Sequence, residues 1–286
     1  MWMTYNCQLV MEDGIGILQP FGTTYSEDKR SLVDADGKQL TNTTVVIGKR
    51  TGYGIYVAGI EVNNINQTDV LGDGTVNYDS ETGVLSLTNV DIDGGTDNYG
   101  IFAYVPFTMA LTGENTVKGK HGLYLTDQTT VNGTGSLYCV GDMGIYSSGP
   151  GITIEGGIHV KAEGTTAFGM GKKNTSAGGI TVRGKETIVE MRGTQGTYDF
   201  NDLTLEDDLI IGIPQGAYFK YGSIVDADGS PVKGQWVIIA QQDYITGAEH
   251  IPGLVLKEEN IYNVAGQRVS KDYKGIIISN GKKLIK

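Results

Sequence analysis

Four aromatic residues recur at a fixed interval in the middle of the chain, and their type and spacing are compatible with ligand binding. Each follows an aliphatic or small residue, and successive pairs lie 22 positions apart: Ile101–Phe102, Leu123–Tyr124, Ile145–Tyr146 and Ala167–Phe168. If the first members point inward, the aromatic members form an outer column against which sugar rings can stack. His121 lies beside this column, next to Gly122.

The opposite register is also compatible with this spacing. In that register Phe102, Tyr124, Tyr146 and Phe168 stack inside the protein, and their aliphatic neighbours lie near a turn. A repetitive fold needs such interior stacks. The change to Ala167 in the last pair fits both registers, so the direction of the column stays open.

Acidic residues gather in a turn and suggest a cation site. Asp91, Asp93 and Asp97 lie close together in the chain, beside Asn98. Calcium takes roughly six to eight oxygen ligands, and spaced Asp and Asn residues in one loop can provide several of them. The three aspartates are therefore candidate calcium ligands. Alternatively, Asp91 and Asp93 alternate with Ile92 on a strand and face solvent.

The sequence contains no recognisable catalytic motif. The three histidines are His121, His159 and His250, and none adjoins a nucleophile elbow or has the spacing of a zinc-binding helix. Two carboxylates from distant coils would suffice for glycoside hydrolysis. A lyase would need a base and a basic cluster, for which residue type alone suggests Lys161, Arg183, Lys185 and Arg192. We predict that the chain is not an enzyme.

The candidate residues belong to a repeat that must position them. Gly100, Gly122 and Gly144 keep the same step of 22 as the aromatic residues. A fixed period in the twenties with glycine at set offsets is typical of a coiled repeat. Short segments with alternating apolar and polar residues, separated by turns, fill each period. We predict an all-β fold, a right-handed parallel β-helix with coils of about 22 residues and β-hairpin caps, its hand following the usual crossover preference.

Composition agrees with this fold and excludes some partners. The chain has 286 residues, with 43 glycines for turns and 39% hydrophobic residues for a core. A net charge of −11 argues against binding to nucleic acid or to anionic membranes. No run of 18 apolar residues is present, so we expect no transmembrane helix.

Two similar segments frame the repeat. Residues 9–37 match residues 203–229, and the match continues from 45–47 to 237–239. Because terminal segments of a repeat must cover an open core, we predict a closing segment of a preceding β-helix unit (1–50), a β-helix unit (51–245) and a C-terminal β tail (246–286). The start lacks the charged and apolar regions of an export signal and resembles a cut inside a longer product.

The tail resembles the C-terminal segment of many secreted and surface proteins of Bacteroidetes. The resemblance lies in Ile261-Tyr262-Asn263, Gly266-Gln267-Arg268-Val269, Lys274-Gly275-Ile276 and Asn280-Gly281-Lys282-Lys283. It implies export from a Gram-negative bacterium, with the tail acting in sorting or attachment.

Residues 53–240 resemble the bacterial "carbohydrate-binding domain-containing" β-helix proteins. The matching stretches are 70–79, 83–90 and 111–117. The resemblance implies a β-helix shaped like polysaccharide lyases that binds acidic or β-linked polysaccharide, with calcium as the one cofactor to consider. We therefore predict an exported, non-catalytic protein that binds polysaccharide or cell-surface glycan on an outer face. The alternatives are a structural or adhesive surface protein without a small-molecule ligand, and a polysaccharide lyase or hydrolase.

Overall fold

The computed structural model describes residues 9–20, 22–169 and 178–246, and the backbone of three short strands between 262 and 285. Nearly all regular structure is β-strand, and the described helix is α1 (Gln242–Thr246). Within the described residues, no helix has the length and apolar character needed to cross a membrane.

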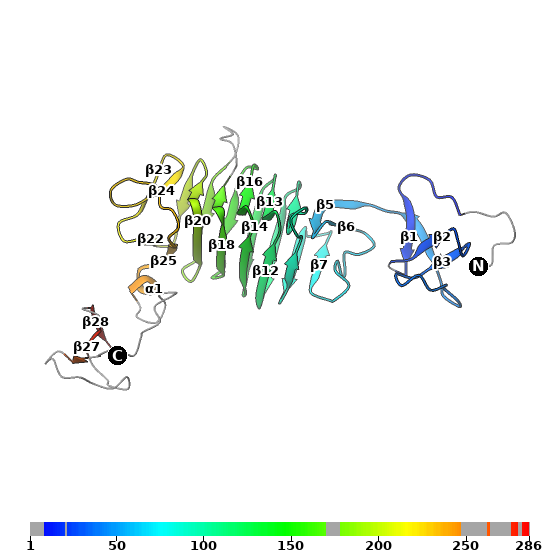
Figure 1. The fold of residues 1–286 in the computed structure, drawn as a ribbon, viewed down its shortest axis with the longest axis horizontal. Coiled ribbons are helices and arrows are strands. Elements are labelled where there is room, and N and C mark those ends of the chain that lie inside the picture. The colour runs from blue at the N-terminus through cyan, green and yellow to red at the C-terminus, as the bar shows by residue number, and fades with distance from the viewer. Residues whose placement is uncertain are drawn as a thin grey trace.

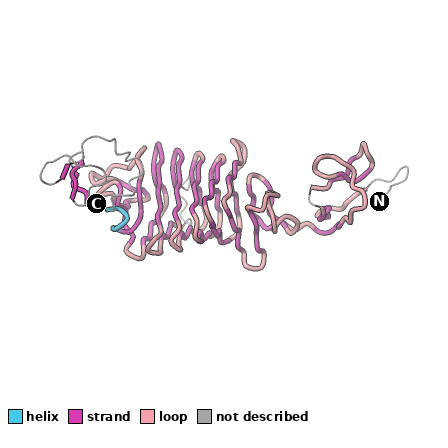
Figure 2. Tube along the Cα trace, turned by 90° about the horizontal axis from the view of Figure 1, so that it is seen from below, coloured by secondary structure: helices cyan, strands magenta, loops and turns pink. Residues whose placement is uncertain are grey.

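The central part of the chain is a parallel β-solenoid of about five turns with about 23 residues in each coil, which confirms the predicted fold class (Figures 1 and 2). Its strands form three faces. The first face consists of β8 (Val84–Thr88), β11 (Phe107–Thr112), β14 (Thr129–Gly133), β17 (Ile152–Ile154), β19 (Ile180–Val182) and β21 (Leu203–Leu205).

The other two faces share their last two strands. The second face contains β9 (Asp91–Asp93), β12 (Glu114–Lys118) and β15 (Ser136–Val140), and the third contains β10 (Ile101–Ala103), β13 (His121–Leu125) and β16 (Met143–Ser147). The long strands β18 (His159–Gly169) and β20 (Ile188–Asp199) run through both faces, since β18 pairs with β15 and with β16.

Antiparallel strands close both ends of the solenoid. At the N-terminal end these are β5 (Gly52–Val57), β6 (Ile60–Asn63) and β7 (Val76–Asp79). At the C-terminal end, β25 (Val237–Gln241) pairs with β20 and with β22 (Leu209–Ile213), and β23 (Tyr218–Lys220) forms a hairpin with β24 (Ser223–Val225). Antiparallel pairing at the ends leaves fewer open strand edges.

Three smaller sheets lie outside the solenoid. Strand β1 (Ile15–Gln19) pairs with β4 (Val46–Lys49), and β2 (Thr24–Ser26) pairs with β3 (Ser31–Val33). These four strands precede the solenoid and lead into β5 through an extended segment (Figure 1). In the tail, β26 (Tyr262–Asn263), β27 (Ile276–Ser279) and β28 (Lys282–Ile285) form an antiparallel sheet. The rest of the predicted tail, including its Gly-Gln-Arg-Val stretch, lies outside the described residues.

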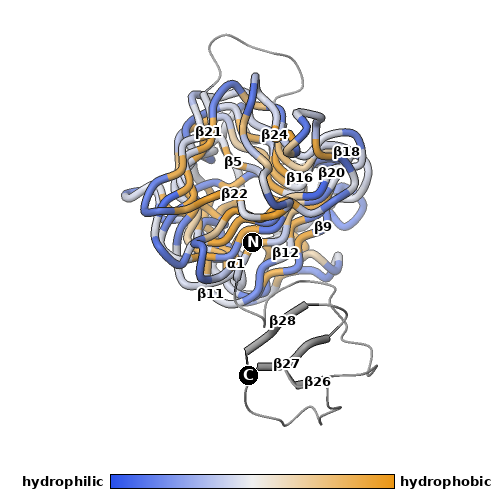
Figure 3. Tube along the Cα trace, turned by 90° about the vertical axis from the view of Figure 1, so that its left-hand side faces the viewer, coloured by the Kyte–Doolittle hydropathy of each residue, from blue (hydrophilic) through white to orange (hydrophobic). Residues whose placement is uncertain are grey.

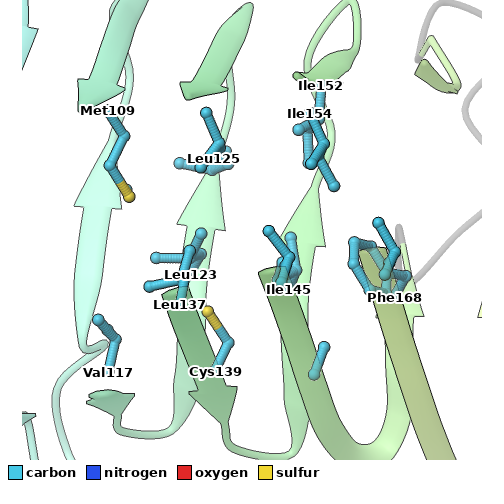
Figure 4. Close-up of a cluster of buried hydrophobic side chains, with 14 of the residues drawn as sticks. Met109, Val117, Leu123, Leu125, Leu137, Cys139, Ile145, Ile152, Ile154 and Phe168 are labelled. Atoms are coloured by element: carbon cyan, nitrogen blue, oxygen red, sulfur yellow. The ribbon is translucent and has the colours of Figure 1, made fainter. Parts of the chain in front are cut away.

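The core is built from columns of equivalent residues. On the third face, parallel pairing places Ile101, Leu123, Ile145, Phe168 and Tyr198 in register, and all are buried. Figure 4 shows Leu123, Ile145 and Phe168 from successive coils inside the solenoid. Viewed along the axis, hydrophobic segments lie inside and hydrophilic ones are most visible at the periphery (Figure 3). Burial of such columns drives the stacking of coils.

The recurring glycines allow neighbouring coils to approach closely. A Cβ at Gly100 would lie 2.6 Å from the carbonyl oxygen of Gly122, and one at Gly122 would lie 2.5 Å from that of Gly144. Real Cβ atoms do not approach backbone so closely, so these positions accept only glycine without a shift. The glycine period therefore follows from coil-to-coil packing where the second face turns into the third.

Candidate ligand-binding face

Three of the four predicted aromatic residues point outward. Phe102 pairs with Tyr124 and Tyr124 with Tyr146 in the parallel sheet of the third face. Their neighbours Ile101 and Leu123 are fully buried, and the three rings are half-buried on the outer surface. Side chains alternate across a strand, so the aliphatic residues fill the core and the rings cover its outside.

Phe168 does not belong to this outer column, contrary to the outward register considered above. It is fully buried and pairs with Ile145, while Gly169 takes the position beside Tyr146. The pairs Leu125–Ser147 and Thr129–Ile152 differ by one residue in spacing, 22 against 23. The intervening turn is thus one residue longer than in the preceding coil, so the residues after it are displaced by one relative to the 22-residue count. Because side chains alternate across a strand, position 168 then falls on the inward side and position 169 on the outward side.

The structure adds three tyrosines to the outer column that sequence reasoning missed. Tyr56 on β5 pairs with Phe102, and Tyr99 and Tyr104 flank β10. We call Tyr56, Tyr99, Phe102, Tyr104, His121, Tyr124 and Tyr146 the aromatic ladder. Two signals could have revealed the additions. Gly54-Ile55-Tyr56 repeats the glycine–aliphatic–aromatic pattern, and Tyr99 precedes His121 by the same 22 residues.

The rings of the aromatic ladder pack on one another along the solenoid. The ring centroids of Tyr124 and Tyr146 are 4.4 Å apart at an interplanar angle of 21°, and those of Tyr99 and Tyr124 are 4.5 Å apart at 27°. His121 stacks on Tyr99 and on Tyr146, with 5.5 Å between centroids in both pairs. Stacked rings attract one another and cover much of each other's flat faces. The ladder therefore presents mainly ring edges and phenol hydroxyls to solvent.

The exposed end of the aromatic ladder lies near β5 and β6, which close the N-terminal end of the solenoid. Tyr104 is 49% exposed, and its ring is tilted by 38° to Tyr56 and by 48° to Phe102. The hydroxyl of Tyr56 donates a hydrogen bond to Glu61 Oε1 at 3.4 Å, and Glu61 pairs with Arg50 at 3.2 Å. This end combines a large exposed ring with polar groups, as in typical contact surfaces.

Packing affects the titration of His121 and Tyr124 within the ladder. Burial lowers the pKa of His121, with smaller opposing and reinforcing effects from Asp142 and Lys120. His121 Nδ1 accepts a hydrogen bond from the Met143 amide at 3.2 Å, which requires that nitrogen to be unprotonated. Burial raises the pKa of Tyr124, and the neighbouring Tyr146 adds to this effect. The ladder is thus a neutral, amphipathic surface.

The candidate calcium ligands do not come together. Asp91 and Asp93 flank the buried Ile92 on β9 and face solvent. Asp91 pairs with Lys118 at 3.4 Å, and Asp93 Oδ1 accepts from the Gly95 amide at 2.8 Å. In the part of the chain that the structure describes, no three His, Cys, Asp or Glu side chains form a group able to hold a metal ion. Asp97 therefore does not complete such a group with Asp91 and Asp93. The proposed calcium site is therefore not supported by the geometry.

Two of the four candidate lyase cations meet on the second face. Lys161 Nζ lies 4.3 Å from the ring centre of Trp236, and Arg192 Cζ lies 4.7 Å from it. Arg192 pairs with Glu163 at 2.6 Å, and Lys161 lies 3.9 Å from Glu190. Each cation is therefore already engaged by a carboxylate and by Trp236 from the C-terminal cap.

The carboxylates of this cluster are engaged as well. Tyr138 donates its hydroxyl proton to Glu163 Oε1 at 2.9 Å; burial, reinforced by Glu163, raises the pKa of Tyr138 to about 12. Glu190 is nearly fully buried and also contacts His159 Nε2 at 3.0 Å. Such internal pairing suits the attachment of the cap to the last coils better than proton transfer to a substrate.

The other two candidate cations lie elsewhere. Arg183 forms an ion pair with Glu155 and lines a shallow depression with Asn132 and Asp207. Lys185 is exposed in the turn after β19. The structure therefore does not assemble all four basic residues into one site.

No family model, curated protein or solved structure matches the chain.

Proposed function

We propose that this chain is an exported, non-catalytic β-solenoid protein that binds polysaccharide on the outer face carrying the aromatic ladder. The observation that carries the proposal is the outward direction of Phe102, Tyr124 and Tyr146 on successive coils, which Tyr56, Tyr99, Tyr104 and His121 extend. Export rests on the likeness of the tail to secreted and surface proteins.

The chemistry of the ladder suits a glycan. Tyrosine combines apolar ring atoms with a hydroxyl and loses little conformational entropy on binding. A sugar likewise presents both C–H groups and hydroxyls. Because most rings cover each other's faces, the glycan would contact ring edges and hydroxyls along the ladder, and the exposed ring of Tyr104 would offer the largest stacking surface.

The non-catalytic part of the proposal has separate support. Lys161 and Arg192, the basic residues that come together, are each neutralised by a carboxylate. Glu190 is buried among its partners. Each ionisable group of this cluster would have to break an ion pair or a hydrogen bond to act as the base of a lyase.

Affinity electrophoresis tests the proposal. The full chain is run through gels that contain neutral β-linked or acidic polysaccharides, and we expect retardation on at least one. Tyr104→Ala and Tyr146→Ala should each weaken binding about tenfold, or about 1.4 kcal/mol, as expected for an aromatic contact residue. Tyr221→Ala is the matched control, because this tyrosine is 86% exposed and lies away from the ladder in the C-terminal cap.

Two outcomes would reject glycan binding by this face. One is unretarded migration of the wild-type chain on the whole panel. The other is equal retardation of the ladder variants and the wild type. Release of reducing sugar or of unsaturated product from the same polysaccharides would instead contradict the non-catalytic assignment.

The stacking of the rings favours one second candidate, a structural or adhesive surface protein in which the ladder only ties coils together. Aromatic pairs contribute roughly 0.5–1.5 kcal/mol each beyond their burial. In this case Tyr146→Ala would lower the free energy of unfolding and leave migration in every gel unchanged.

A further inference from the structure

The chain contains the same β substructure twice. Strands β1 and β4 pair antiparallel in the register of β22 and β25, and the hairpin β2–β3 matches β23–β24. We call residues 12–49 the N-terminal copy and residues 206–241 the C-terminal cap.

The two substructures agree in the details of a turn. Asp34 Oδ1 accepts hydrogen bonds from the amides of Asp36 and Lys38 at 3.1 and 2.8 Å. Asp226 Oδ1 accepts from Asp228 and Ser230 at 3.0 and 2.9 Å. Isolated bridges follow at Val33–Gln39 and Val225–Pro231. The N-terminal copy therefore has the construction of a solenoid cap.

Of the two substructures, the C-terminal cap covers a coil among the described residues, and the N-terminal copy does not. There β25 pairs with β20 through Val237–Met191 and Ile239–Val189, and Val237, Ile238 and Ile239 are at most 1% exposed. In the N-terminal copy the equivalent β4 pairs with β1 and, among the strands that the structure describes, with no other. Val46 is 40% and Ile47 46% exposed, although their equivalents Ile238 and Ile239 are buried.

The exposure extends beyond β4. Ile15 is 38% exposed, whereas its equivalent Leu209 is 5% exposed. Met11 is also exposed, whereas its equivalent Leu205 lies partly buried in β21 against the core and pairs with β19. An open strand edge beside exposed aliphatic side chains is a template for pairing with another strand.

We propose that the N-terminal copy is a docking surface for the end coil of a second β-solenoid. A strand of that coil would pair antiparallel with β4, as β20 pairs with β25, and would cover Val46, Ile47 and Ile15. The equivalent surface of the C-terminal cap already forms such an interface with β20, in the last coil of this chain's own solenoid. The solenoid of this chain is not the occupant, because β5 and β25 close its two ends.

A cap exchange in the full chain tests whether the N-terminal copy can cover a coil. Residues 206–241 are replaced by residues 12–49, which places a second β4 against β20. We expect a monomer with one cooperative thermal transition within about 5 °C of the wild type. In hydrogen exchange, peptides covering β4 should show two populations, one fast as in the wild type and one at least about 100-fold slower. The same chimera with Val46→Asp and Ile47→Asp in the transplanted copy should aggregate.

A milder variant keeps the test decisive if the chimera fails to fold. Ile238→Val, Ala240→Gly and Gln241→Lys together give β25 the sequence of β4. If β4 is built to cover a coil, this variant stays monomeric and retains slow exchange in β20. Rapid exchange of β20 in this variant would overturn the proposal. Self-association of the wild-type chain with protection of β4 would also overturn it, because the occupant would then be another copy of this chain.

Discussion

Phe102 and Phe168 are equivalent in the 22-residue period of the sequence but lie in opposite environments. Phe102 packs outside against Tyr56, Tyr99, Tyr104 and Tyr124, whereas Phe168 lies inside the core. A phenylalanine at the same place in the period thus contributes to the surface in one coil and to the hydrophobic interior in another.

Truncation of these two rings should have unequal costs. Phe168→Ala leaves a cavity in the core and should lower the free energy of unfolding by about 3–5 kcal/mol. Phe102→Ala removes contacts on a half-exposed surface and should cost about 1–2 kcal/mol. Urea denaturation of both variants measures the difference. Equal costs would contradict the opposite placement of the two rings.

His121 should make stability depend on pH. Its pKa is lowered in the folded protein, so between that pKa and its ordinary value of 6.5 the unfolded state binds more protons. The contribution of His121 is therefore complete above about pH 6.5 and is lost as the pH falls.

Urea denaturation at pH 7.5 and pH 5.5 checks this dependence. We expect His121→Phe, which keeps a ring in the ladder and cannot titrate, to lose less stability between the two pH values than the wild type loses. An equal loss in both proteins would show that His121 does not contribute to the dependence.

For single residues, the sequence specified the repeat period but not which side chains face inward and which face outward. Ile101, Leu123 and Ile145 were recognisable as equivalent positions on the same side of successive strands, because side chains alternate along a strand. Whether the side chains at a given place in the period point into the core or toward solvent depends on the length of the preceding turns. The extra residue between Ser147 and Ile152 that turns Phe168 inward is a local detail of one turn.

At the scale of elements, the buried glycines determine how closely the strands of successive coils approach. Gly122 lies between the second and third faces, in contact with the backbone of the next coil. The alternation of apolar and polar residues predicted short strands with one inward and one outward side. This pattern did not predict that β18 and β20 each continue through two faces.

Gly122→Ala should be strongly unfavourable. Its Cβ would lie 2.5 Å from the carbonyl oxygen of Gly144, which cannot move without displacing a coil. We expect a loss of about 1–3 kcal/mol. Gly196→Ala is the control, because no atom lies within 4 Å of its added Cβ, and it should change stability by less than about 0.5 kcal/mol. Thermal unfolding compares the two, and similar midpoints would refute the close packing at Gly122.

At the scale of the whole molecule, the caps decide whether the ends of the solenoid are closed. Ile239 on β25 is buried where β25 pairs with β20, whereas its equivalent Ile47 is half exposed. Sequence comparison found the two matching segments, but only their surroundings show that one covers a coil and the other has an open face.

Matched lysine substitutions should separate these two environments. Ile239→Lys places a charge in the interface with the last coil and should cost at least about 3 kcal/mol and cause aggregation. Ile47→Lys should cost about 1 kcal/mol or less. Urea denaturation and light scattering provide the readouts. A large loss with Ile47→Lys would mean that β4 is covered in solution.

The sequence by itself determined that this chain coils, because the glycine and aliphatic positions recur with a period that only stacked, equivalent strands satisfy. It also marked Phe102, Tyr124, Tyr146 and Phe168 as one set. Tertiary structure decided that the first three of these rings face outward, that Phe168 does not, and that Tyr56, Tyr99 and Tyr104 join them. The reason is physical: period reflects the repeated contact between coils, whereas direction and neighbourhood depend on turn lengths and on cap strands from outside the repeat.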